Sequence, residues 1–412
     1  MSPWHSARRR ARGFSLVELM VSMVIGLVLT MAITVVLVRS ESSKRSTTSV
    51  NDINQTAAYV TYVMDRHLRS AGSGFAQRWT DAFGCVLNAT KAGVAVLPRA
   101  AAIASPFANA ALNPRLAPVM IQADGADVGG GGEIRGDLIT VMAGTAPTSG
   151  SPMLVVTSSV TANPSSGNLQ LPNTLGFQNG DVVVLADSGV PQGCMTQQVG
   201  GLPAAGGGAT MLLPLAGEYY TATGAAVALG GFGGATYAIP IGSTPANPPQ
   251  FFVYGVGDNR TLFGYDLFQF TAPDQPFQVA DGVIEMRAVY GLDTTNPPDG
   301  TLDRWVRPDV ASGFDAASLS DGSDAARQKL RQIVAVRLGF ILRTSLKEKE
   351  MTLGANYNGG TQTYSLDLFG DLVADGHDVL RRRVVSGDDR YYRFRTVEVT
   401  VPLRNVMAAP GS

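Results

Sequence analysis

Side chains that could carry out acid–base or nucleophilic chemistry are scarce in this sequence. Its 412 residues include only three histidines, His5, His67 and His377. A Ser-His-Asp triad would need one of them, yet no G-x-S-x-G nucleophile turn and no glycine-rich phosphate loop occurs. Carboxylates are present as in any chain of this size, and no pair stands out. We therefore predict that the protein is not an enzyme and uses no cofactor.

An oxygen-rich loop between residues 293 and 303 has side chains of the type that bind calcium. The candidate ligands are Asp293, Asn296, Asp299 and Asp303. Their spacing departs from that of an EF-hand loop, because no bidentate glutamate follows at the right place and two prolines intervene. We interpret the segment as a Pro/Gly/Asp turn and predict no metal site.

Two cysteines, Cys85 and Cys194, are the only thiols. They form no CxxC pair, so a cysteine-based zinc site is not expected. If the globular part of the chain lies outside the cytoplasm, they are natural disulfide partners. The bridge would then close a loop of about 110 residues. The alternative is two unrelated buried thiols.

Arginines alternate with aromatic residues near the C-terminus. The cluster comprises Arg381, Arg382, Arg383, Arg390, Tyr391, Tyr392, Arg393, Phe394 and Arg395. Such a pattern can hold single-stranded DNA. Asp388, Asp389 and Glu398 balance the charge locally, and the formal net charge of the chain is −1. We interpret the cluster as a solvated hairpin face and do not expect DNA binding.

The N-terminus combines a basic leader with a long apolar run. Four arginines between residues 8 and 12 precede residues 14–38, a stretch of 25 residues whose only charged side chain is Glu18. As a helix, this run would be about 37 Å long, enough to cross a hydrocarbon layer of about 30 Å. The arginines should stay in the cytoplasm, so the rest of the chain would lie outside it.

Two ordinary explanations of this segment fit poorly. A secretory signal has an apolar region of about 7–15 residues with a small-residue cleavage site after it. Here the run is longer, and the small residue, Gly13, stands before it. A plain membrane anchor leaves Glu18 unexplained, because a carboxylate in hydrocarbon costs a few kcal/mol. Cleavage after Gly13 would create an α-amino group at Phe14 that could pair with it.

The sequence Gly13-Phe14-Ser15-Leu16-Val17-Glu18-Leu19 resembles the type III signal of type IV prepilins. The resemblance implies that a membrane prepilin peptidase cuts after Gly13 and methylates the new N-terminal Phe14. It also implies that Glu18, then the fifth residue, is the assembly carboxylate, which pairs with the N-terminal amine of a neighbouring subunit in the filament.

Beyond the apolar run, residues 39–72 continue the helical pattern. Apolar side chains recur at spacings of three and four, at Ile53, Ala57, Val60, Met64 and Leu68. This is one stripe of an amphipathic helix, and Ala71-Gly72-Ser73-Gly74 is a stop signal. We predict one helix from about residue 14 to 71, with its first half in lipid or a filament core and its second half under a globular domain.

The rest of the chain predicts strands. Residues 75–250 form a region rich in Gly, Ala and Pro with short β-like runs, and residues 251–412 have longer ones. The runs are 138–142, 153–158, 181–185, 211–215, 236–241, 251–255, 262–271, 283–290, 333–343 and 391–403, with a short helix at 325–332. We expect an α+β, pilin-like fold: a long N-terminal helix packed on a loop-rich antiparallel β domain.

Several segments resemble the PilW-type minor pilins. They are residues 62–72, Gly84-Cys85, residues 281–293, residues 334–338 with Arg343, and residues 401–405. The resemblance implies a non-catalytic minor pilin that takes part in type IV pilus assembly or priming by helix packing. Residues 1–13 would be the leader, 14–38 the transmembrane or filament-core helix, and 39–72 its amphipathic continuation.

The implied location is the inner membrane, with a single span and a periplasmic C-terminal domain, and later the pilus or cell surface. The implied partners are the prepilin peptidase, other minor and major pilins, the inner-membrane assembly machinery, and membrane lipid before assembly. Two alternatives remain open at this point. They are a type II secretion pseudopilin, which uses the same signal, and a membrane-anchored adhesive or binding module built on residues 75–250.

Overall fold

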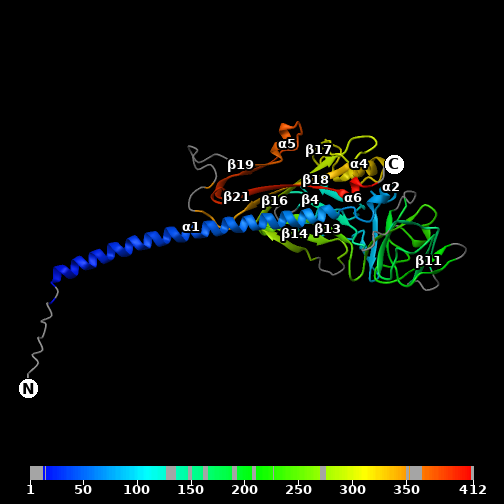
Figure 1. Cartoon of the computed structure of the whole chain (residues 1–412), viewed down its shortest axis with the longest axis horizontal. Coiled ribbons are helices and arrows are strands. Elements are labelled where there is room, and N and C mark those ends of the chain that lie inside the picture. Colours follow the sequence, from blue (N-terminus) through cyan, green and yellow to red (C-terminus); the bar gives the residue numbers. More distant parts are fainter. Residues whose placement is uncertain are drawn as a thin grey trace, which may run out of the picture. The chain divides into compact units, whose positions relative to one another are not determined.

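The structure is a computed structural model with an α+β architecture, in which one long helix is followed by mainly antiparallel sheets (Figure 1). It describes residues 13, 15–126, 136–146, 151–160, 166–187, 193–206, 210–225, 227–269, 275–348, 352 and 364–409. The chain divides into two units, Met1–Asp52 and Ile53–Ser412, and each is described by itself.

Helix α1 spans Leu16–Ser70 without a break. Its sequence contains no proline, so every backbone N–H can take part in the helical ladder. The helix ends where Gly72 adopts a φ of 77° and donates its N–H to Met142 O at 2.9 Å. A left-handed glycine commonly ends a helix, because no Cβ opposes that conformation. The predicted single long helix is confirmed.

The second half of α1 is held by its apolar stripe. Ile53, Ala57, Val60, Met64 and Leu68 are all buried, with at most 7% of any of them exposed. They belong to the largest hydrophobic core among the described residues, together with side chains from three sheets. Burying such side chains contributes about 1.5–3 kcal/mol each for the larger ones, so this stripe fixes the helix on the domain.

Two antiparallel sheets contribute to this core, together with strands of a third sheet described below. The first has the strand order β15–β14–β13–β4–β3, and the second has the order β17–β16–β18–β21. Their bounds are β3 Val119–Gln122, β4 Leu138–Ala143, β13 Gln250–Gly257, β14 Thr261–Asp266, β15 Phe277–Asp281, β16 Val283–Leu292, β17 Arg304–Val306, β18 Ile333–Arg343 and β21 Phe394–Pro402. Strand β4 pairs with β13, so the regions before and after residue 250 share one sheet.

A second lobe consists of two further sheets. One has the order β2–β1–β9–β8–β12–β5, and the other has the order β10–β11–β7–β6. Their bounds are β1 Leu87–Lys91, β2 Val94–Leu97, β5 Met153–Leu154, β6 Thr157–Val160, β7 Gly167–Leu171, β8 Asp181–Ala186, β9 Cys194–Gln198, β10 Ala204–Ala205, β11 Met211–Leu215 and β12 Tyr237–Ser243. Only β1 and β9 pair in parallel among these described strands.

Strand β8 lies between two hydrophobic cores, which explains why polar and apolar residues do not alternate along it. Val182 and Val184 face the main core, while Val183 and Leu185 face a second core shared with β7 and β11. Successive side chains of a strand point to opposite faces, so a strand covered on both faces is apolar throughout.

Short elements complete the domain. A hairpin of β19 (Tyr364–Leu368) and β20 (Arg381–Val385), with helix α5 (Gly370–Ala374), covers the second face of β16 and β18 through a third core. The other short helices are α2 Trp79–Ala82, α3 Ala316–Leu319, α4 Asp324–Gln332 and α6 Arg404–Met407. Helix α4 confirms the predicted helix near residues 325–332, and Ser323 caps it by accepting the N–H of Ala326.

Most predicted strands agree with the structure to within two residues, and three differ by more. Residues 153–158 form two strands, β5 and β6, in different sheets. The strand expected over 262–271 ends at Asp266, because its carboxylate accepts the N–H of Phe268 at 2.9 Å and turns the chain. The last strand starts at Phe394 rather than at residue 391, after a short 3₁₀ turn at Gly387–Tyr391.

A disulfide joins Cys85 to Cys194, with a Cα–Cα distance of 5.6 Å. It links the segment after α2 to strand β9, 109 residues later. Leu87 of β1 pairs with Cys194, so the bridge lies where β1 and β9 begin to run in parallel.

His67 of α1 contacts strand β13. Its Nδ1 contacts the hydroxyl of Tyr254, and its ring stacks on Phe252 with centroids 5.7 Å apart. Burial, aided by the neighbouring Arg66, lowers the pKa of His67 below its usual value of 6.5. The imidazole is therefore neutral at neutral pH and serves helix packing.

We predict that removing the disulfide weakens the domain strongly. In the double variant Cys85→Ser/Cys194→Ser, the unfolded chain regains the freedom of a loop of about 110 residues, worth about 4–5 kcal/mol. Thermal unfolding of wild type with and without reductant, and of the double variant, measures the loss. Reductant should lower the midpoint of wild type alone. Equal midpoints for all samples would show that the bridge is dispensable.

We also predict that acid weakens the domain through His67. Its unfolded pKa is about 6.5 and its folded pKa is lower, so the unfolded chain binds the proton more readily as pH falls below about 6.5. The stability that neutral His67 contributes above that pH is therefore lost as pH falls. The unfolding free energy of wild type should fall more between pH 7.5 and 5 than that of His67→Gln. Parallel pH dependence of the two proteins would contradict this assignment.

Candidate functional site

The processing signal lies at the start of α1. Gly13 is exposed, whereas residues 1–12 and Phe14 lie outside the described residues. The carbonyl of Ser15 accepts the N–H of Leu19 at 3.0 Å, so the helix begins directly after it. Glu18 is exposed in the first helical turn, where the unpaired N–H groups of the helix favour a carboxylate.

Side chains of α1 from Leu16 to Val38 are exposed within their unit. Leu16, Leu27 and Met31, for example, are 74%, 70% and 69% exposed. By length and composition, α1 is able to cross a membrane. An apolar surface of this extent is far larger than the patches that monomeric soluble proteins show. The segment therefore needs either hydrocarbon or other apolar helices around it.

The few polar groups in this segment are satisfied within the helix. The hydroxyls of Ser22, Thr30 and Thr34 donate to backbone carbonyls three or four residues earlier, at 2.8–2.9 Å. A hydroxyl bonded in this way needs no hydrogen-bond acceptor outside the helix, so it can be placed where water is absent. Glu18 is thus the one side chain of residues 16–38 that still requires a partner in an apolar environment.

The histidines weighed as catalytic candidates are placed apart by the structure. His67 packs on β13, and His377 lies in the loop after α5, so these two histidines belong to different elements. Within the described part of the chain, no group of three His, Cys, Asp or Glu side chains could hold a metal ion.

The loop of residues 293–303 is built as a turn. The buried carboxylate of Asp293 accepts the N–H groups of Thr295 and Gly300, at 3.0 and 2.6 Å. Asp303 accepts the N–H and the hydroxyl of Thr294, and these hydrogen bonds lower the pKa of Asp303. The carboxylates that resemble calcium ligands are therefore used to hold the backbone of the loop.

Three arginines of the cluster form ion pairs within the domain. Arg382 pairs with Asp367 at 2.8 Å, and Arg393 pairs with Glu348 at 2.8 Å. Arg383 reaches Glu285 at 2.9 Å. These pairs tie Arg382 and Arg383 of β20, and Arg393 just before β21, to acidic side chains of the same domain.

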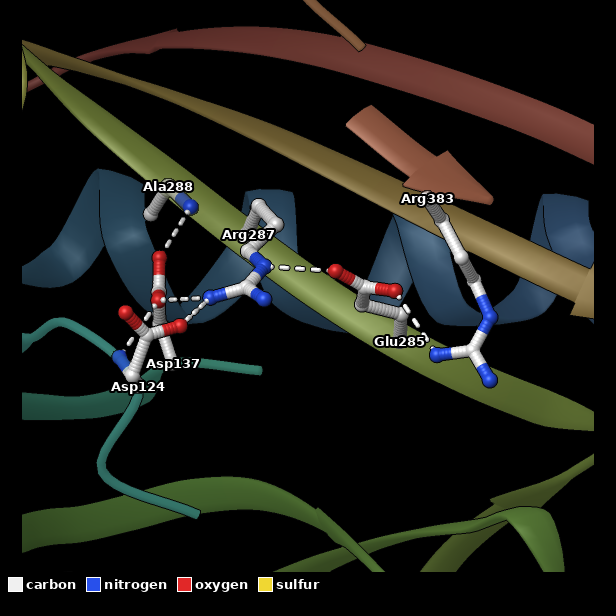
Figure 2. Close-up of polar contacts among 6 residues, drawn as sticks. All are labelled: Asp124, Asp137, Glu285, Arg287, Ala288 and Arg383. Carbon is white, nitrogen blue, oxygen red and sulfur yellow. Dashed lines mark hydrogen bonds and ion pairs between the residues drawn. The ribbon is translucent and has the colours of Figure 1, made fainter. Parts of the chain in front are cut away.

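A buried charge cluster was not foreseen from the sequence. Figure 2 shows Arg287 of β16 between Asp137 and Glu285, with Nη1 3.0 Å from Asp137 and Nε 2.6 Å from Glu285. Asp137 is fully buried and also accepts the N–H of Ala288 at 2.9 Å. Burial raises the pKa of Asp137, and the guanidinium of Arg287 opposes that rise.

This cluster has a structural role. Asp137 immediately precedes β4, and its own N–H donates to Met286 O at 2.9 Å. It therefore fastens the start of β4, in one sheet of the main core, to β16 in another. Nothing in the sequence around Asp137 could have identified a partner 150 residues away.

Two family models match the chain. The prokaryotic N-terminal methylation motif matches residues 8–34, and type IV pilus-assembly protein W matches residues 251–405. No curated protein and no solved structure matches. The first match contains Gly13, Phe14 and Glu18, and the second runs from β13 to the end of β21 and beyond. Over these two segments, the chain is similar to type IV pilin-like proteins of the PilW type.

Proposed function

We propose that the protein is a minor pilin that takes part in assembly or priming of a type IV pilus by helix packing, without catalysis. One observation carries the proposal. A helix that starts within a methylation motif leaves the apolar side chains of residues 16–38 exposed, while residues 53–68 of the same helix are anchored in a folded domain. Such a helix can exchange lipid for the helices of other subunits without unfolding its domain.

Processing prepares the helix for this exchange. The prepilin peptidase cuts after Gly13 and methylates Phe14, which places a positive α-amine four residues before Glu18. In an apolar environment, an unpaired carboxylate costs a few kcal/mol. The amine of a neighbouring subunit removes that cost, so Glu18 selects for a subunit that is correctly placed along the filament axis.

The disulfide supports a periplasmic location for the domain. Such bonds persist in oxidising compartments such as the bacterial periplasm and are rare in the cytosol. The protein first resides in the inner membrane with a single span, and later in the pilus or at the cell surface. Its partners are the prepilin peptidase, other minor and major pilins, the inner-membrane assembly machinery, and lipid before assembly.

The match to type IV pilus-assembly protein W favours a pilus over a type II secretion pseudopilus, which uses the same signal. The ion pairs of the arginine cluster argue against a DNA-binding role.

We predict that Glu18→Ala impairs assembly while leaving membrane insertion and cleavage intact. The variant loses the partner of the neighbour's amine, so its incorporation into sheared filaments should fall about tenfold or more, as expected when ~1.4 kcal/mol or more is lost. Membrane fractionation and the mobility of the processed chain check insertion and cleavage.

Glu41→Ala is the matched control, because Glu41 lies on the same helix beyond the apolar segment and pairs with Arg45 at 3.2 Å. It should be incorporated normally. Wild-type incorporation of Glu18→Ala would refute the proposed role of Glu18.

A further inference from the structure

A groove lies between α1 and strand β21. It has a volume of about 380 Å³. Ala57, Ala58, Thr61 and Tyr62 line its helix side, and Val397 and Val399 line its strand side. Both walls belong to the unit of residues 53–412, and the surface is mainly apolar.

Among the described strands, β21 is the edge of its sheet. It pairs with β18 along its whole length, from Ala335↔Pro402 to Arg343↔Phe394, and it stands last in the strand order. Alternate N–H and C=O groups of an antiparallel strand point away from its neighbour, so the outer edge of β21 offers backbone donors and acceptors. Exposed edges of this length are templates for a further strand.

The layer of side chains beneath α1 is incomplete at this edge. On β18, Val336, Leu338 and Phe340 are at most 1% exposed. On β21, Val397 and Val399 are only partly buried, although they continue the same layer. One more strand beside β21 would bury both valines and would also cover Tyr62, which is 63% exposed.

Polar side chains stand at both ends of the groove. At one end, Arg395 contacts the side chain of Asn54. At the other, Asp65 uses Oδ2 to accept from Arg69 at 2.7 Å, while its buried Oδ1 accepts no hydrogen bond from the described residues. Asp65 is thus occupied by its own helix, whereas Arg395 is exposed, so an occupant that brings an acidic group to Arg395 would be complementary in charge at that end.

We propose that this groove binds an extended strand of another pilin-like subunit, which adds to the edge of β21. Its backbone pairs with β21, and its small or apolar side chains face Ala58 and Tyr62 of α1 at every second position. A helix could cover the valines but would leave the backbone groups of β21 unpaired. The class of partner rests on the proposed function, whereas the strand-binding surface does not.

Site-specific photo-crosslinking tests this contact in cells that assemble the filament. Full-length chains carry Tyr62→p-benzoylphenylalanine or, as the matched control, Tyr59→p-benzoylphenylalanine. Tyr59 is 54% exposed on the same helix but does not line the groove. The expected result is an adduct from position 62, and not from 59, that mass spectrometry maps to an extended segment of another pilin-like subunit.

A second pair of variants separates the groove from the helix in general. Ala58→Arg fills the groove and should lower the adduct yield from position 62 about tenfold, equivalent to ~1.4 kcal/mol. Gln55→Arg adds the same side chain at an exposed position of α1 outside the groove, and it should leave the yield unchanged. No adduct from position 62, equal adducts from 59 and 62, or an unchanged yield with Ala58→Arg would overturn the proposal.

The same cells distinguish this proposal from the proposed function. If the chain is processed and incorporated into filaments but position 62 gives no adduct, strand addition is wrong and the minor pilin function stands. If position 62 gives the strand adduct but the chain is never incorporated, the surface stands and the filament role fails.

Discussion

The burial of one apolar stripe of α1 in the main core is the interaction on which the rest of the structure depends. Ile53, Val60, Met64 and Leu68 join the helix to the sheets of that core, and His67 completes the contact through Tyr254. With this half of the helix fixed, residues 16–38 of the same helix have no described apolar partner in their unit and require lipid or other helices. The domain anchors residues 53–68 of the helix, and the proposed assembly role falls to residues 16–38.

Two further contacts link the parts of the domain that pack against α1. The Cys85–Cys194 bridge ties the chain just after the helix to the second lobe, and Asp137 with Arg287 joins two sheets of the main core. Removing one member of a buried ion pair is far more costly than never having had the pair, because the other charge stays unpaired. Strand β21 has no further strand beside it among the described residues, and its edge lies next to α1.

Local patterns predicted those features whose cause is local. The spacing of Ile53, Ala57, Val60, Met64 and Leu68 predicted the buried face of α1, and the apolar run at 333–343 predicted β18 over its full length. The sequence contains no comparable local pattern that indicates which distant segments pair. Nothing in the sequence indicated that β4 pairs with β13, that β5 and β6 belong to different sheets, or that Asp137 meets Arg287. The processing signal was recognised from residues 13–19, but the groove depends on an edge strand whose position only the sheet order reveals.

The N-terminal mass of the protein from native membranes or sheared filaments tests the central claim most directly. A chain that begins at Phe14 and is heavier by one methyl group is the result that the account predicts. It would place Glu18 four residues from a new α-amine and make the exposed half of α1 an assembly element. A chain that still begins at Met1, in cells whose prepilin peptidase is active, would contradict the account and reduce residues 1–38 to a plain membrane anchor.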